Sequence, residues 1–127
     1  MWLWEGELRE LGFRRGAGGY WRCARRFGLQ GDEHISAFAR SEQGVSGSRP
    51  DARGLMIELS ELHVTFPLGE NVHFYYHERT ETEWEPGGFT SGAEICRLGL
   101  SPVRLRERAD RLAGEIIAAI GGVLQPR

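Results

Sequence analysis

Three of the four histidines and one glutamate have the spacing to meet on one face of a β-hairpin. Glu61 and His63 stand two residues apart, and His73 and His77 follow after a turn. Residues two apart on a strand share a face, and cross-strand neighbours on that face lie roughly 5 Å apart. Imidazole and carboxylate groups at such distances can ligate a divalent metal or exchange protons. A metal-binding protein or hydrolase that uses these four residues is therefore one alternative interpretation.

The same pattern also fits the solvent-exposed face of an ordinary hairpin, because His, Thr and Tyr are common strand residues. The chain has no HExxH motif for zinc and no GxSxG elbow for a serine nucleophile. We therefore favour the solvent-exposed face over the metal site. A non-enzymatic protein is more strongly indicated than an enzyme, and no cofactor is expected.

The two cysteines offer little further chemistry. Cys23 and Cys96 belong to no CxxC motif and have no zinc-type spacing. Arginines beside Cys23 could lower the pKa of its thiol, but burial next to Trp21 is the more common state for a cysteine. We expect both cysteines to be reduced thiols.

The most concentrated charge in the chain is acidic. Residues 54–95 contain eight acidic residues and a single basic one, Arg79, whereas both flanks carry a small excess of arginine. Within this region four glutamates surround one tryptophan: Glu78, Glu81, Glu83, Trp84 and Glu85. Like charges this close together must stay solvated, and a tryptophan within a charged rim matches an interface hot spot. We expect this segment to bind a basic protein partner, unless Trp84 folds inward to complete the core.

A small chain with an acidic binding segment and no catalytic motif is similar, in general type, to antitoxin and immunity proteins. Such proteins neutralise a partner by charge complementarity. This similarity implies a protein-binding module as the principal function. It adds no residue to the site beyond the acidic segment.

A nucleic-acid-binding module is a second alternative. All 16 basic residues are arginines, and five of them stand close together near the amino terminus with aromatic neighbours. These five are Arg14, Arg15, Arg22, Arg25 and Arg26, and the aromatic residues among them are Tyr20 and Trp21. A net charge of −2 argues against nucleic acid as the main partner.

Four strands are needed to position these groups. Alternating apolar residues and turn signals predict strands at 20–27, 33–40, 55–66 and 72–78. A change of phase near Ser60–Glu61 predicts a β-bulge in the third strand. Residues 67–71 form the expected hairpin turn, and 41–54 and 80–88 are expected to be loops.

Two helices complete the predicted fold. Helical spacing of Trp4, Leu8 and Leu11 predicts a short helix at 3–11, and a longer apolar face predicts a helix at 102–120 that ends at Gly121. A capping pattern at 91–94 predicts one helical turn. The expected architecture is α+β, with a four-stranded antiparallel meander and both terminal helices on one face in the order α-β-β-β-β-α.

Length and composition set the remaining limits. A chain of 127 residues with 40% hydrophobic and 27% charged residues is expected to form a single domain over 1–127. No apolar run approaches the roughly 20 residues of a membrane helix, and no signal-peptide pattern is present. We therefore expect a cytoplasmic protein with no membrane contact.

Overall fold

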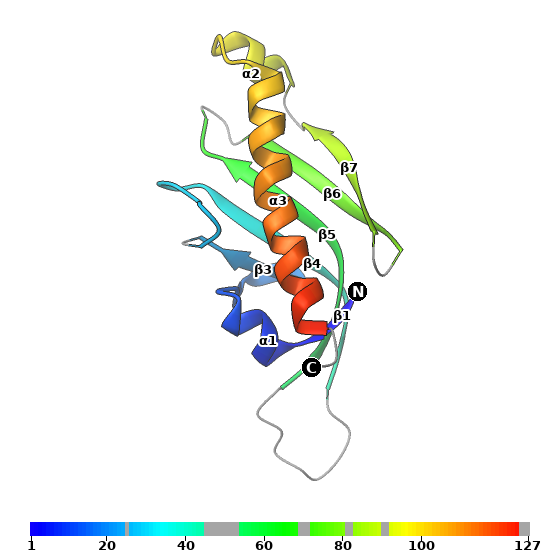
Figure 1. The fold of residues 1–127 in the computed structure, drawn as a ribbon. Coiled ribbons are helices and arrows are strands. Elements are labelled where there is room, and N and C mark those ends of the chain that lie inside the picture. Colours follow the sequence, from blue (N-terminus) through cyan, green and yellow to red (C-terminus); the bar gives the residue numbers. More distant parts are fainter. Residues whose placement is uncertain (25, 45–53, 69–71, 81–82, 90–91, 125–127) are drawn as a thin grey trace.

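A computed structural model describes residues 1–24, 26–44, 54–68, 72–80, 83–89 and 92–124. Its centre is one antiparallel sheet with a long helix lying across it (Figure 1). The prediction of an α+β fold is confirmed. None of the helices in the described part of the chain combines the length and apolarity that crossing a bilayer requires.

Most of the sheet is a meander, because all but the first of its strands lie beside their neighbours in the chain. Its main path runs β2-β3-β4-β5-β6-β7, and the short strand β1 pairs separately with the first part of β5. The bounds are β1 Trp2–Trp4, β2 Arg14–Arg15, β3 Tyr20–Cys23, β4 His34–Gln43, β5 Met56–Phe66, β6 Val72–Thr80 and β7 Glu83–Phe89. The predicted four strands correspond to β3, β4, β5 and β6.

The predicted number of strands was therefore too low, since the described residues form a seven-stranded sheet. Strand β7 was predicted as a loop, because it contains Pro86 and Gly87, which disfavour strands. It lies at the edge of the sheet, where a proline is tolerated because its missing N–H faces no neighbouring strand. Pairing with β6 thus outweighs the low preference of these residues for a strand.

The amino terminus departs from the prediction in a similar way. Residues Trp2–Trp4 form a strand rather than the start of a helix, and only Glu5–Glu10 are helical, as α1. Leu3 is buried and its two tryptophan neighbours are only half-buried. Burial that alternates from one residue to the next is typical of a strand. Three residues are too few for that period to be recognised against the helical spacing of Trp4 and Leu8.

The bulge predicted in the third strand is confirmed. Leu59 and Glu61 of β5 pair with consecutive residues of β4, so Ser60 has no partner in the ladder. This extra residue lets both Leu59 and Leu62 face the core. The strand therefore buries one face along its whole length.

Helix α3 covers this buried face. It spans Pro102–Leu124, and its buried residues are Ala109, Leu112, Ala113, Ile116 and Ile120. It continues past Gly121, because glycine weakens a helix by about 1 kcal/mol without necessarily ending it. The hydroxyl of Tyr76 on β6 donates a hydrogen bond to Asp110 of α3 at 2.8 Å, which joins helix and sheet.

Figure 1 shows α1 and α3 on the same side of the sheet, with the short helix α2, Gly92–Arg97, at one end of α3. A single 3-10 turn, Ala17–Gly19, connects β2 and β3. The described helices thus leave the opposite side of the sheet uncovered. We call that side the open face.

Candidate functional site

The histidine group of the sequence analysis lies on the open face. On β5 and β6, Glu61 pairs with His77 and Thr65 pairs with His73. Between these two pairs, His63 lies opposite Tyr75. The alternate residues of both strands, including Val64 and Phe74, are buried against the helix side. His63, His73 and His77 therefore share one face, as the strand pattern predicted.

These side chains contact one another in pairs. His63 Nε2 lies 2.9 Å from Glu61 Oε1, and His77 Nδ1 lies 3.9 Å from the same oxygen. His73 Nδ1 is instead 2.8 Å from the hydroxyl oxygen of Thr65. Within the residues that the structure describes, no group of three His, Cys, Asp or Glu side chains is arranged to hold a metal ion. The metal hypothesis therefore gains no ligand set from this part of the chain.

Two of these histidines, His63 and His77, belong instead to a series of rings that crosses four strands. From β3 to β5, the ring centroids of Tyr20 and Phe38 are 6.0 Å apart and those of Phe38 and His63 are 4.5 Å apart. From β5 to β6, His63 lies 5.8 Å from Tyr75, and Tyr75 lies 5.3 Å from His77. All five are half-buried or exposed, so part of each ring faces solvent. We call this series the ring track.

Tyr20 and Phe38 were not predicted to lie beside the histidines. The pairing of β3 with β4 and of β4 with β5 places them there, because Tyr20 lies directly opposite Phe38 and Phe38 lies opposite Glu61. The alternation of half-exposed Phe38 with buried Ala37 in β4 was the available signal. Placing Phe38 beside His63 required the register between β4 and β5.

Two tyrosines of the ring track cover glycines on neighbouring segments. A Cβ atom at Gly16 would lie 2.5 Å from ring atoms of Tyr20, and one at Gly87 would lie 2.5 Å from the ring of Tyr75. Such distances are closer than nonbonded carbon atoms approach. Each ring thus occupies the space that a side chain at the glycine would need, which holds the ring against the sheet.

Two imidazoles on the open face are held toward the neutral form. Burial lowers the pKa of His73, and the nearby His63 and His34 lower it further. Burial also lowers the pKa of His34, and the positive charge of Arg22 acts in the same direction. This part of the face therefore gains positive charge only under mildly acidic conditions.

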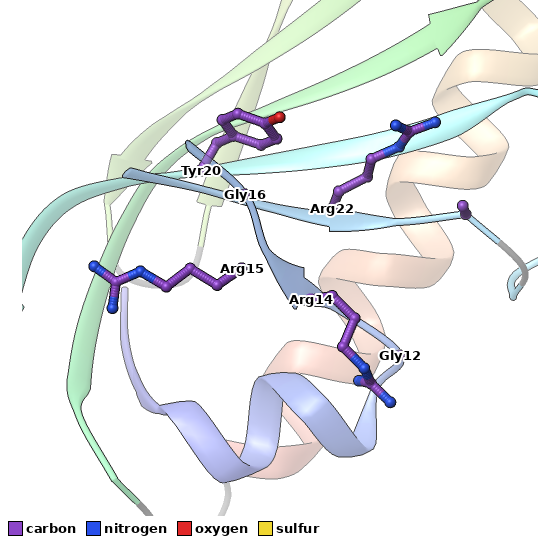
Figure 2. A pocket seen from close by; sticks show the side chains of 7 residues that line it. Gly12, Arg14, Arg15, Gly16, Tyr20 and Arg22 are labelled. Carbon is purple, nitrogen blue, oxygen red and sulfur yellow. The ribbon is translucent and has the colours of Figure 1, made fainter. Parts of the chain in front are cut away.

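A pocket adjoins the ring track where β2 meets β3. It has a volume of about 450 Å³, and Figure 2 shows the side chains around it. Three arginines, one tyrosine and three small residues line it: Gly12, Arg14, Arg15, Gly16, Tyr20, Arg22 and Ala24. We call it the arginine pocket.

The charges of the arginine pocket are unevenly neutralised. Arg15 forms an ion pair with Glu42 at 2.6 Å, so its charge is balanced. Arg14 donates hydrogen bonds to two backbone carbonyls, those of Arg9 at 3.1 Å and Phe13 at 2.8 Å. Neither Arg14 nor Arg22 forms an ion pair with any described residue. Two positive charges of the pocket therefore have no carboxylate partner among the described residues.

A second cavity differs from the arginine pocket because its charged side chains are paired. This cavity, about 230 Å³, is lined in part by Arg40, Glu58 and Glu78. Arg40 lies 2.7 Å from Glu58 and 3.7 Å from Glu78, so cation and anions neutralise each other. The arginine pocket differs in combining a hollow with arginines that have no carboxylate partner among the described residues.

The acidic segment lies on the hairpin of β6 and β7. Glu78 has only 7% of its side chain exposed and forms ion pairs with the amino group of Met1 and with Arg40. Glu83 is exposed and paired with Arg79, whereas Glu85 is exposed and lies opposite His77.

Trp84 is half-buried and packs against the core beside the pairing position of Glu78. Glu81 lies outside the described residues. Of the described carboxylates in the segment, only that of Glu85 is both exposed and without an ion pair.

Of the remaining predicted groups, Cys23 is buried and Cys96 is exposed, and these two described cysteines form no disulfide with each other. Arg26 donates to the backbone carbonyl of Glu10 at the end of α1, where a cation is favoured by the helix dipole. Arg25 lies outside the described residues.

Comparison with known proteins adds no assignment to this geometry. No family model matches the chain, and no curated protein or solved structure matches it. The function is therefore argued from the arginine pocket, the ring track and the acidic hairpin alone.

Proposed function

We propose that the protein is a non-enzymatic binding module that takes an anionic ligand in the arginine pocket. One observation carries the proposal: Arg14 and Arg22 line a hollow of about 450 Å³ and are paired with no described carboxylate. A guanidinium group offers parallel N–H donors that match the oxygens of a phosphate or carboxylate. Phosphate and carboxylate are therefore the groups we expect the pocket to bind.

The placement of the two arginines supports this proposal energetically. Arg14 and Arg22 are directly opposite each other on neighbouring strands, an arrangement that like charges destabilise. An anion bound in the pocket would offset that repulsion. The volume of the pocket is within the usual range for small-molecule sites, about 300–1,000 Å³.

The test is a calorimetric titration with inorganic pyrophosphate at low ionic strength. We expect binding to the unaltered protein and at least a fivefold weaker affinity for Arg22→Gln, in line with about 1 kcal/mol for an exposed charge contact. Arg104→Gln is the matched control, since it removes the same charge from an exposed position on α3. Equal affinities for the two variants, or no binding at all, would refute the proposal.

The acidic hairpin remains a second candidate, as a site for a basic protein partner. Its support is the exposed carboxylate of Glu85 next to Glu83, whereas the half-buried Trp84 and the ion-paired Glu78 are less available. Titration with an arginine-rich peptide tests it. Glu83→Gln and Glu85→Gln should each speed dissociation or slow association of that peptide. Unchanged association and dissociation rates for both variants would mean that the hairpin is only a solvated edge of the sheet and not a binding site.

A further inference from the structure

The arginine pocket and the ring track form one continuous surface. Tyr20 belongs to both, because it lines the pocket and is also the first ring of the track. Arg22 follows two residues later on the same face of β3, at the position opposite Ser36. An anion in the pocket would therefore lie at the Tyr20 end of the ring track.

Cross-strand register divides this surface into rows that run perpendicular to the strands. One row runs from the arginines to Tyr75: Arg14, Arg22, Ser36, His63 and Tyr75. The carboxylates of the open face, Glu61 and Glu85, are in the adjacent row with His77. The row that starts at the arginines is therefore free of carboxylates across the described strands that it crosses.

The other side of that row adds imidazoles and, among the described residues of these strands, no acidic side chain. His34, Thr65 and His73 are the next cross-strand positions along β4, β5 and β6. His63 and His73 are 6.4 Å apart between ring centroids, so the imidazoles extend the ring surface. A ligand lying along the row would meet two arginines at one end, then Ser36, and then the rings of His63 and Tyr75. Tyr20 and Phe38 lie beside it in the adjacent row, where Glu61 contacts His63 at 2.9 Å.

We propose that the ligand of this surface is a single-stranded nucleic acid, with a phosphate in the arginine pocket and bases stacked on the ring track. This inference rests on the proposed function, because it assigns the class of the anion. Every base has a face that can stack on an aromatic ring, and a phosphate matches the two guanidinium groups. The alternation of anion and planar ring in a polynucleotide is the pattern that this surface complements.

The geometry favours a single strand over a duplex. The bases of a duplex are stacked on one another, so they cannot lie on rings that are held against a sheet. Tyr20 and Tyr75 are held in this way over Gly16 and Gly87. Only two of the arginines that line the pocket lack a described carboxylate partner, so binding should rely on stacking rather than on many phosphate contacts.

The experiment measures fluorescence anisotropy of a labelled oligodeoxythymidylate of about 12 nucleotides, a length within the usual site sizes for such surfaces. We expect Tyr75→Leu to weaken binding about tenfold, because a base that stacks on the tyrosine ring loses its stacking partner. Tyr75→Phe keeps the ring and should bind within about twofold of the unaltered protein. Circular dichroism of each variant checks that the fold is retained.

Salt dependence tests the arginines separately. For a single strand the slope of log K against log salt is about 0.7 per phosphate contacted, so Arg22→Gln should reduce it by about 0.7. Arg104→Gln, on the helix side of the sheet, should leave the slope unchanged. Equal binding of a duplex of the same length would contradict the proposal.

The outcomes separate this inference from the proposed function. If pyrophosphate binds through Arg22 but the oligonucleotide binds no more tightly and Tyr75→Leu has no effect, the nucleic-acid assignment is wrong and the anion pocket stands. If neither pyrophosphate nor the oligonucleotide binds, both proposals fail. If the oligonucleotide binds and Tyr75→Leu and Arg22→Gln both weaken it, the assignment is supported.

Discussion

Arg14 on β2 lies directly opposite Arg22 on β3, yet their guanidinium groups do not come together, because that of Arg14 donates to the carbonyls of Arg9 and Phe13. Figure 2 shows the two side chains diverging from their paired strands. Separation is the expected response of like charges placed on facing positions. It leaves between them a hollow that is lined by cations and contains no described carboxylate, on which the proposed function depends.

The first prediction concerns Gly87, which Tyr75 covers. A Cβ atom at Gly87 would lie 2.5 Å from the ring of Tyr75 and 2.8 Å from the backbone oxygen of Tyr75. Gly87→Ala should therefore force the ring or the backbone of Tyr75 to move. We expect a loss of about 1–3 kcal/mol in the free energy of unfolding, the usual effect of overpacking. Gly88→Ala is the control, because a Cβ atom added there would have no described atom within 4 Å beyond its chain neighbours. Urea denaturation measures both, and equal stability of the two variants contradicts the contact.

The second prediction concerns the packing of α3. Leu112 is 4% exposed and faces the sheet, so Leu112→Ala should lower the free energy of unfolding by about 2–5 kcal/mol. Arg111→Ala, at the exposed neighbouring position, should change it by less than about 0.5 kcal/mol. A loss at Leu112 as small as that at Arg111 would mean that α3 contributes little to the core.

The third prediction concerns pH. The pKa of His73 is lowered in the folded protein, so the unfolded chain takes up a proton at a higher pH than the folded chain does. The free energy of unfolding should therefore be highest above about pH 7 and fall as the pH drops through about 6.5. This pH range lies above the pKa values of ordinary carboxylates. Their titration therefore contributes little to the change in the free energy of unfolding.

The variant His73→Gln isolates this effect. It keeps a polar partner for Thr65 but cannot titrate, so its stability should fall less than that of the unaltered protein between about pH 7.5 and 5.5. Denaturant titrations at the two pH values give the comparison. Parallel losses in both proteins would show that His73 titrates normally.

The sequence predicted the parts of the fold that have a strong period. The alternation of Val72, Phe74 and Tyr76 located β6, and the apolar stripe through Leu112 and Ile116 located α3. These patterns arise because one face is buried and the other is not. The bulge at Ser60 was readable for the same reason, since the buried face changes phase there.

The missed elements have weak local signals. Strand β7 contains Pro86 and two glycines, and it forms because it pairs with β6, although two irregularities interrupt their ladder. The candidate site was missed in a related way. Arg14, Arg22 and Tyr20 were noted as neighbours in sequence, but the pocket between them depends on the pairing of β2 with β3. Tertiary pairing, and not the residue types alone, creates the site.

The most direct test of the central claim is a titration of the isotopically labelled protein with pyrophosphate, followed by amide chemical shifts. We predict that the largest changes fall on Gly12, Gly16 and Arg22 around the arginine pocket. The amides of α3, such as those of Arg104 and Arg111 on the other side of the sheet, should not move. Changes centred on α3, or spread evenly over the surface, would contradict the claim that the pocket is the binding site.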